Sequence, residues 1–300
     1  MSDIKDIAII IFDRYESFAW NLLNTLEIRF MNIHQNVKNN LIDSLVKESW
    51  NDDINHLNIA LRYLSKWRSI LITNTYIENE GLVVFQGPFK GMKFLREPTE
   101  GCNAAKLLGT YEQPLHSYLD KIISNNYNLI INVGSAEGYY SVGLAMRCRL
   151  AKILTFDTND DAKKACKDLA IKNNVESSIQ ILSEFHPSIL KDYKHTKSLL
   201  ICDVEGDEKN LLDISKHKEL KEIDILVEAH ECLVPGITEE LINRFSSSHE
   251  ISLIHDDGKR ILNSPPNWFL KLDHLDQLLS TWEWRSGATP WLFMQVLNIK

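Results

Sequence analysis

Residues 129–141 read LIINVGSAEGYYS. The first five form an apolar run in which only Asn132 is polar, which is typical of a strand buried on both faces of a parallel sheet. Gly134 and Gly138 follow, and they permit a positive φ or a close backbone approach that a side chain resists. From Tyr139 onward, apolar residues recur at helical spacing. The stretch predicts a strand, a glycine turn and a helix, with free N–H groups and partial positive charge at the tip of a sheet, where a ligand would bind.

Strands and helices alternate along the rest of the chain. Further strands are predicted at residues 152–156, 179–182, 199–204, 225–229, 251–254 and 291–297. Helices are predicted at 159–173 and 238–245, after Gly206 and within 100–123, while 81–95 is interpreted as two short strands joined by a turn. We therefore expect an α/β fold with a Rossmann-like, seven-stranded, mostly parallel sheet and helices on both faces. In such sheets ligands bind outside the carboxyl ends of the strands, where the strand order reverses.

The N-terminal region has a different pattern. Residues 1–80 contain neither glycine nor proline, and their apolar residues recur at helical spacing. One stripe comprises Phe18, Leu22, Leu23, Leu26 and Phe30, and another comprises Leu57, Ala60, Leu61, Leu64 and Trp67. We expect a helical extension over 1–80 and the α/β domain over 81–300. The extension is interpreted as a cap on that domain, a substrate lid, or the contact surface of a homodimer.

Composition narrows the class of protein. The net charge of −8 and the lack of a long Lys/Arg run argue against binding to a nucleic-acid backbone. The five cysteines include no CxxC pair, which suits a reducing compartment. The short apolar run at 7–12 follows acidic residues and is neither a signal peptide nor a membrane span. We expect a cytoplasmic protein.

The glycine turn is compatible with two classes of cofactor. The dinucleotide fingerprint GxGxxG needs a middle glycine that the stretch from Gly134 to Gly138 lacks, and Glu137 would repel a pyrophosphate. Asp157 ends the second predicted strand at about the spacing, roughly 20 residues, at which an acidic residue binds ribose hydroxyls. A ligand that has a ribose and, in place of the pyrophosphate, a cationic amino-acid portion suits this turn better, and S-adenosylmethionine is such a ligand. A nicotinamide cofactor is the weaker alternative.

Several motifs in order resemble the FkbM-type family of class I S-adenosylmethionine-dependent methyltransferases. The matching segments are GTYEQPL (109–115), NVGSAEGYYS (132–141), FD (156–157), ICDVEGDEKNLLD (201–213) and ILVEAHE (225–231). The resemblance covers roughly residues 81–297 and implies methyl transfer. Asn132 stands where the family has an acidic residue, and Ser135 where it has alanine; Glu137 or Glu112 is expected to supply the missing charge. The cofactor-binding residues predicted on this basis are Glu112, Asn132, Gly134, Ser135, Glu137, Gly138, Tyr139, Asp157, Glu184 and Asp203.

Four titratable residues stand at the carboxyl ends of the fourth and fifth predicted strands. Asp203 and Glu205 are two apart, as are Glu228 and His230, so each pair is expected to project to one side of its strand. If the strands are neighbours, the four groups converge at one rim. Asp203, Glu228 and His230 are predicted to position or deprotonate the methyl acceptor. The same three could instead bind a divalent cation such as Mg²⁺, although no spacing rule singles this out.

The resemblance favours O-methylation of a sugar or another small polar hydroxyl acceptor. The alternatives are N-methylation of an amine or peptide, and a scaffold protein that keeps a cofactor pocket without catalysis. Trp282, Trp284 and Trp291 are interpreted as late core residues or as a face for a sugar ring, and residues 255–257 as a polar loop.

Overall fold

The computed structural model describes residues 53–99, 101–285 and 287–297, with side chains from residue 57 onward. The chain divides into two compact units, residues 1–68 and 69–300. The predicted stripe from Phe18 to Phe30 lies outside the described residues. Helix α3 (Asp53–Glu80) confirms helical structure over the second predicted stripe. The domain boundary at residues 80 and 81, and a homodimer through the N-terminal helices, stay predictions.

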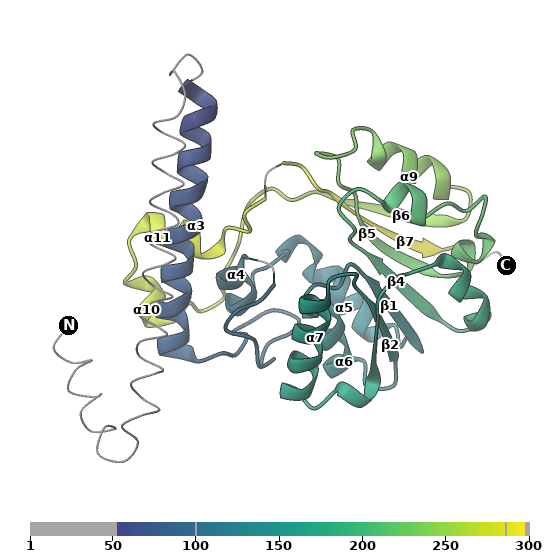
Figure 1. The fold of residues 1–300 in the computed structure, drawn as a ribbon, viewed down its shortest axis with the longest axis horizontal. Helices are drawn as coiled ribbons and strands as arrows, with labels where there is room; N and C mark the ends of the chain where they lie inside the picture. The colour runs from purple at the N-terminus through teal and green to yellow at the C-terminus, as the bar shows by residue number, and fades with distance from the viewer. Residues whose placement is uncertain (1–52, 100, 286, 298–300) are drawn as a thin grey trace. The chain divides into compact units, whose positions relative to one another are not determined.

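One seven-stranded sheet forms the centre of the second unit (Figure 1). Its strands are β1 (Leu129–Val133), β2 (Lys152–Phe156), β3 (Ile179–Leu182), β4 (Ser198–Cys202), β5 (Asp224–Glu228), β6 (His249–Ile254) and β7 (Trp291–Val296). Their order is β3-β2-β1-β4-β5-β7-β6, and only β7 runs antiparallel to its neighbours. The chain therefore reverses its direction of winding between β1 and β4. This switch point is where a Rossmann-like sheet opens a crevice for a ligand.

Helices cover both faces of the sheet, as predicted. Beyond α3, the described helices are α4 (Asn103–Leu108), α5 (His116–Ser124), α6 (Tyr139–Arg147), α7 (Asp160–Lys172), α8 (Glu208–Leu211), α9 (Ile237–Phe245), α10 (Asn267–Leu270) and α11 (His274–Thr281), with 3₁₀ turns at Gln113–Leu115, Glu176–Ser178, Pro187–Tyr193 and Lys218–Glu222. Of these, α10 and α11 lie away from the sheet (Figure 1). Alternate strand residues point to opposite faces, so Ile130 packs with α5, α6 and α7 while Ile131 packs with α9. Figure 1 shows α5, α6 and α7 together beside β1 and β2, and α9 on the other side of the sheet.

The structure corrects two expectations about the elements and adds two helices. Residues 81–95 form a single antiparallel bridge, between Val83 and Lys93, because Gly87 and Gly91 turn the backbone to positive φ. Strand β4 ends at Cys202, two residues earlier than predicted. The short helices α10 and α11, which lie between β6 and β7, were not expected from the sequence.

Candidate active site

The glycine turn after β1 packs against the end of β4. Gly134 has a φ of 76°, and a Cβ built on it would lie 1.6 Å from the carbonyl oxygen of Asp203. The Asp203 N–H donates to the carbonyl of Val133 at 3.0 Å. Only glycine fits at this position, because both the backbone conformation and the contact exclude a side chain. The close approach fixes Asp203 at the switch point of the sheet.

The N–H groups of the turn are bonded within the protein, which corrects the expectation that they are free. Gly134 and Ser135 both donate to the carbonyl of Phe156, at 3.0 and 3.1 Å. Ala136 donates to Oδ2 of Asp157 at 2.8 Å, and Gly138 donates to the carbonyl of Ser135 at 2.8 Å. The parallel strand β2 ends beside the turn and provides most of these acceptors. These four N–H groups are therefore not available to a phosphate.

Glu137 and Gly138 are held by the protein interior. Glu137 is fully buried and forms an ion pair with Lys106, and it accepts a hydrogen bond from Thr99 at 3.0 Å. Burial alone would raise the pKa of Glu137, but Lys106 outweighs it and holds the pKa below its usual value. Gly138 has a φ of 88°, and a Cβ there would lie 2.6 Å from the sulfur of Cys166 on α7. Both residues thus anchor the turn to neighbouring helices.

A cavity of about 430 Å³, here called the switch-point cavity, opens between the ends of β1, β2, β3 and β4. Its walls are Val133, Gly134, Phe156, Asp157, Thr158, Ser183, Glu184, Phe185, Asp203, Val204, Glu205, Asp207 and Leu211. Four of the predicted cofactor-binding residues, Gly134, Asp157, Glu184 and Asp203, are among them. The aromatic walls Phe156 and Phe185 were not among the predicted cofactor-binding residues, although each is next to one of them, Asp157 and Glu184. Their rings meet edge to face with centroids 5.2 Å apart.

The other predicted cofactor-binding residues are not among the walls of that cavity. The buried Asn132 donates to the hydroxyl of Ser141 at 2.9 Å, so both partners of this hydrogen bond are neutral. An acidic residue at position 132 would instead bury a negative charge beside that hydroxyl. The ring of Tyr139 packs against four other aromatic rings, those of Phe89, Phe94, Tyr111 and Tyr140. The hydroxyl of Ser135 is buried and has no hydrogen-bond partner among the described residues. A role for these residues in binding the cofactor stays a prediction.

His230 lies at the centre of the predicted rim. Its Nδ1 is 2.5 Å from Oε1 of the fully buried Glu208. Its Nε2 is 3.5 Å from Asp203 Oδ1, 3.5 Å from Glu205 Oε2 and 3.7 Å from Glu228 Oε2. Burial lowers the pKa of His230, but the hydrogen bond to Glu208 and the surrounding carboxylates outweigh burial and raise it. Asp203, Glu228 and His230 each have one ligand atom within 4.8 Å of the other two, so the predicted convergence of these residues is present. Their catalytic role stays a prediction.

The reason for this convergence differs from the expected one. Asp203 and Glu205 lie beyond the end of β4, and Glu205 has a left-handed φ of 53°, so strand alternation does not align them. His230 likewise follows the end of β5. The turn after β4 brings the two carboxylates to one side.

A second cavity of about 240 Å³, here called the rim cavity, lies next to the first. Its walls are Gly101, Cys102, Tyr111, Asp203, Glu205, Glu228, His230, Cys232, Leu233, Glu283, Trp284, Arg285 and Thr289. Asp203 and Glu205 line both cavities. A ligand in the switch-point cavity and one in the rim cavity would therefore meet at these two carboxylates.

Arg285 lines the rim cavity opposite the strand ends, a role that no pattern in the sequence indicates. Its guanidinium pairs with Glu228 and with Glu112, the latter at 2.7 Å, and donates to Thr289 at 2.5 Å. Burial raises the pKa of Glu112 to about 8 even though Arg285 acts to lower it. Glu112, a predicted cofactor ligand, also accepts from the hydroxyl of Tyr140.

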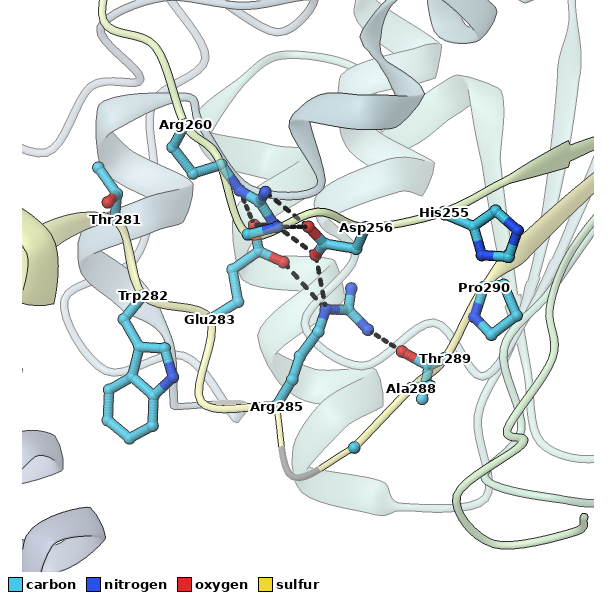
Figure 2. A pocket seen from close by; sticks show the side chains of 12 residues that line it. His255, Asp256, Arg260, Thr281, Trp282, Glu283, Arg285, Ala288, Thr289 and Pro290 are labelled. Carbon is cyan, nitrogen blue, oxygen red and sulfur yellow. Dashed lines mark hydrogen bonds and ion pairs between the residues drawn. The ribbon is translucent and has the colours of Figure 1, made fainter.

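A third cavity, of about 260 Å³, continues from Arg285 (Figure 2). There Asp256 and Glu283 lie between Arg285 and Arg260 (Figure 2), and Asp256 Oδ2 is 2.6 Å from Arg260 and 3.5 Å from Arg285. Asp256 belongs to the predicted polar loop, which therefore has a structural role in this network. Of the three tryptophans, Trp291 is a core residue, whereas Trp282 lines this cavity and Trp284 lines the rim cavity.

No described helix is long and apolar enough to cross a membrane. No protein-family model matches the sequence, and no curated protein matches it significantly. Among solved structures, the chain is similar to the O-methyltransferase TomG from Streptomyces achromogenes in complex with S-adenosylmethionine (11% identity, 78% of this chain and 99% of that chain covered, TM-score 0.44). It is also similar to an O-methyltransferase from Bacillus cereus in complex with S-adenosylhomocysteine (9%, 63% and 82%, 0.40) and to a human methyltransferase 10 domain containing protein (12%, 77% and 96%, 0.43). These likenesses are distant, and the fold is defined by the strand order of this chain itself.

Proposed function

We propose that the chain is an S-adenosylmethionine-dependent methyltransferase that acts on a hydroxyl group of a sugar or another small polar acceptor. The observation that carries the proposal is the pair of cavities that share Asp203 and Glu205 at the switch point of the sheet. Two reactants bound on either side of a shared wall are brought together in one orientation, and such positioning can contribute about 7–11 kcal/mol to lowering a barrier.

The residues of the switch-point cavity fit this cofactor. A volume of about 430 Å³ is within the usual range for small-molecule sites. Asp157 lines the cavity, where its carboxylate would accept hydrogen bonds from ribose hydroxyls, and the aromatic walls Phe156 and Phe185 suit an adenine ring. The bonded N–H groups of the glycine turn disfavour the pyrophosphate of a nicotinamide cofactor. When bound, S-adenosylmethionine supplies a methyl group that an acceptor oxygen takes as the carbon–sulfur bond breaks and its electron pair stays on sulfur.

The charges of the rim cavity restrict the acceptor. Four carboxylates line it, Asp203, Glu205, Glu228 and Glu283, beside one arginine and one histidine. Arg285 is already paired with Glu112 and Glu228. An acceptor bearing phosphate would therefore meet like charge, whereas a neutral polyol would meet hydrogen-bond acceptors. Asp203, whose side chain is about one quarter exposed, and the exposed Glu205 would take the proton that the acceptor hydroxyl loses.

The motif resemblance supports membership of the FkbM-type family, and with it a hydroxyl acceptor. Two alternatives give different results in the same assay. An N-methyltransferase would consume the cofactor with amines but not with sugars. A scaffold protein would bind the cofactor and turn over with neither class.

The test is methyl consumption from S-adenosylmethionine with a panel of sugars, nucleotide sugars and amines. Glu228→Gln and His230→Gln should lower turnover by about 10²–10⁴-fold while binding S-adenosylhomocysteine nearly as well as the parent, because they act on the acceptor. Asp203→Asn should lower turnover as strongly, and because Asp203 also lines the switch-point cavity it should weaken cofactor binding as well. Asp161→Asn, on the exposed side of α7, is the control and should keep parental turnover. Full turnover in the three rim variants would place the chemistry elsewhere.

A further inference from the structure

The space in front of His230 Nε2 is too wide for hydrogen bonds. Oxygens of Asp203, Glu205 and Glu228 stand 3.5, 3.5 and 3.7 Å from this nitrogen. Protein hydrogen bonds between nitrogen and oxygen span about 2.7–3.2 Å. Two bonds of about 2.1 Å that meet at a metal ion at roughly 90–120° place their donor atoms about 3.0–3.6 Å apart. The two separations of 3.5 Å fall within this range, and the separation of 3.7 Å to Glu228 lies just above it, so a small inward shift would bring the three oxygens and Nε2 to an ion.

The ring of His230 is oriented as metal-binding imidazoles are. Its side chain is only 5% exposed, and Nδ1 bonds Glu208 Oε1, which also accepts from the N–H of Gly206. Because Nδ1 is bonded to a buried carboxylate, Nε2 is the ring nitrogen that faces the three oxygens and would give its lone pair to an ion bound there. A carboxylate behind the second ring nitrogen is the arrangement that fixes the tautomer of metal-ligating histidines.

Glu228 divides its two oxygens between different partners. Oε1 binds Arg285, while Oε2 faces His230. Arg285 thus holds the carboxylate in place without occupying the oxygen that faces the cluster. The arginine therefore helps to orient Glu228 as a ligand.

We infer that Asp203, Glu228 and His230 bind one divalent first-row transition ion such as Mn²⁺. Glu205 is close enough to provide a fourth ligand. Carboxylates alone would suit Mg²⁺, but an imidazole nitrogen shifts the preference toward transition ions. The identification of the ligands stands on this geometry alone. The ion's task rests on the proposed function: a hydroxyl bound to it would lose its proton to Asp203 or Glu205 more readily before it takes the methyl group.

The experiment measures binding of Mn²⁺ to the full chain after chelator treatment and dialysis. Electron paramagnetic resonance reports the free ion, without cofactor or acceptor present. The parent should bind one Mn²⁺ per chain, and His230→Gln and Asp203→Asn should abolish this binding. Glu208→Gln, which touches no ion, should weaken it by about 10–100-fold. His186→Gln is the control. It removes an exposed histidine whose Nε2 lies 3.6 Å from Glu184, and Mn²⁺ binding should be unchanged.

Circular dichroism would confirm that each variant is folded, and Asp203→Asn, the more exposed site, provides the second variant if His230→Gln unfolds. The inference is overturned if the parent binds no Mn²⁺ at millimolar concentration, or if folded Asp203→Asn and His230→Gln bind it as the parent does. Separate titration with S-adenosylhomocysteine distinguishes the two proposals. If the protein binds S-adenosylhomocysteine but not Mn²⁺, only the proposed ion site is overturned. If it binds Mn²⁺ but not S-adenosylhomocysteine, only the proposed methyltransferase function is overturned.

Discussion

Gly134 and Asp203 are in backbone contact across the switch point of the sheet, so closely that a single added carbon at Gly134 would overlap the Asp203 carbonyl oxygen. Gly134 belongs to the turn that borders the switch-point cavity, and Asp203 lines both that cavity and the rim cavity. The contact therefore couples the position of the proposed cofactor to the position of the candidate catalytic groups. Disturbing it should affect both.

Gly134→Ala should test this coupling against Gly258→Ala. The two glycines have similar φ values, 76° and 73°, but a Cβ at Gly258 would meet nothing within 4 Å. Gly258→Ala should cost only the backbone strain of about 1–2 kcal/mol. Gly134→Ala should cost about 1–3 kcal/mol more, because the overlap forces the backbone to shift, and it should weaken binding of S-adenosylhomocysteine. Urea denaturation and calorimetry measure the two effects. Equal losses in both variants would show that the contact is unimportant.

Asp157→Asn should weaken binding of S-adenosylhomocysteine by about 10–100-fold. One oxygen of Asp157 accepts from the N–H of Ala136 and the other from the N–H of Asn159, so the carboxylate holds the turn as well as facing the cavity. Losing hydrogen bonds to a charged group costs about 1.5–3 kcal/mol. Asp160→Asn, three residues away on an exposed side chain, is the control and should bind normally. Unchanged affinity in Asp157→Asn would reduce Asp157 to a structural residue.

Lys106→Met should destabilise the protein by about 3–5 kcal/mol, because it leaves Glu137 charged and buried. Both side chains are almost inaccessible to solvent. Adding Glu137→Gln to this variant should recover much of the loss, since the unpaired charge disappears. Chemical denaturation of the parent, both single variants and the double variant gives the coupling energy. If the losses of the single variants simply add, the pair contributes no specific stability.

The stability of the protein should fall with rising pH because of Glu112. Its pKa is about 8 in the folded chain against an ordinary value of 4.5, since burial disfavours the charged carboxylate. Between these two values folding takes up a proton, so the free energy of unfolding decreases as pH rises. Glu112→Gln removes this dependence, so relative to the variant the parent should lose stability between about pH 5 and about pH 8. A difference between parent and variant that stays constant over this range would mean that Glu112 is ionised throughout.

The local elements were predictable because each is encoded in a short stretch of sequence. The run before Gly134 predicted β1, and the helical pattern over 159–173 predicted α7, whose first turn is capped by the side chain of Asn159. The convergence of Asp203 and His230 followed from the neighbouring placement of β4 and β5.

Contacts between distant segments could not be predicted in this way. Glu112 and Arg285 are 173 residues apart, and no periodicity links them. The bonded state of the turn's N–H groups also depends on where β2 ends, which the sequence near Gly134 does not specify.

Calorimetric titration of the parent protein with S-adenosylhomocysteine and, separately, with NAD tests the central claim most directly. The account predicts one site per chain with micromolar affinity for S-adenosylhomocysteine and a raised melting temperature, because a ligand that binds only the folded state stabilises it by about 2.7 kcal/mol at a hundredfold excess over Kd. It predicts no binding of NAD. Binding of NAD in place of S-adenosylhomocysteine, or binding of neither at millimolar concentration, would contradict the assignment of the switch-point cavity.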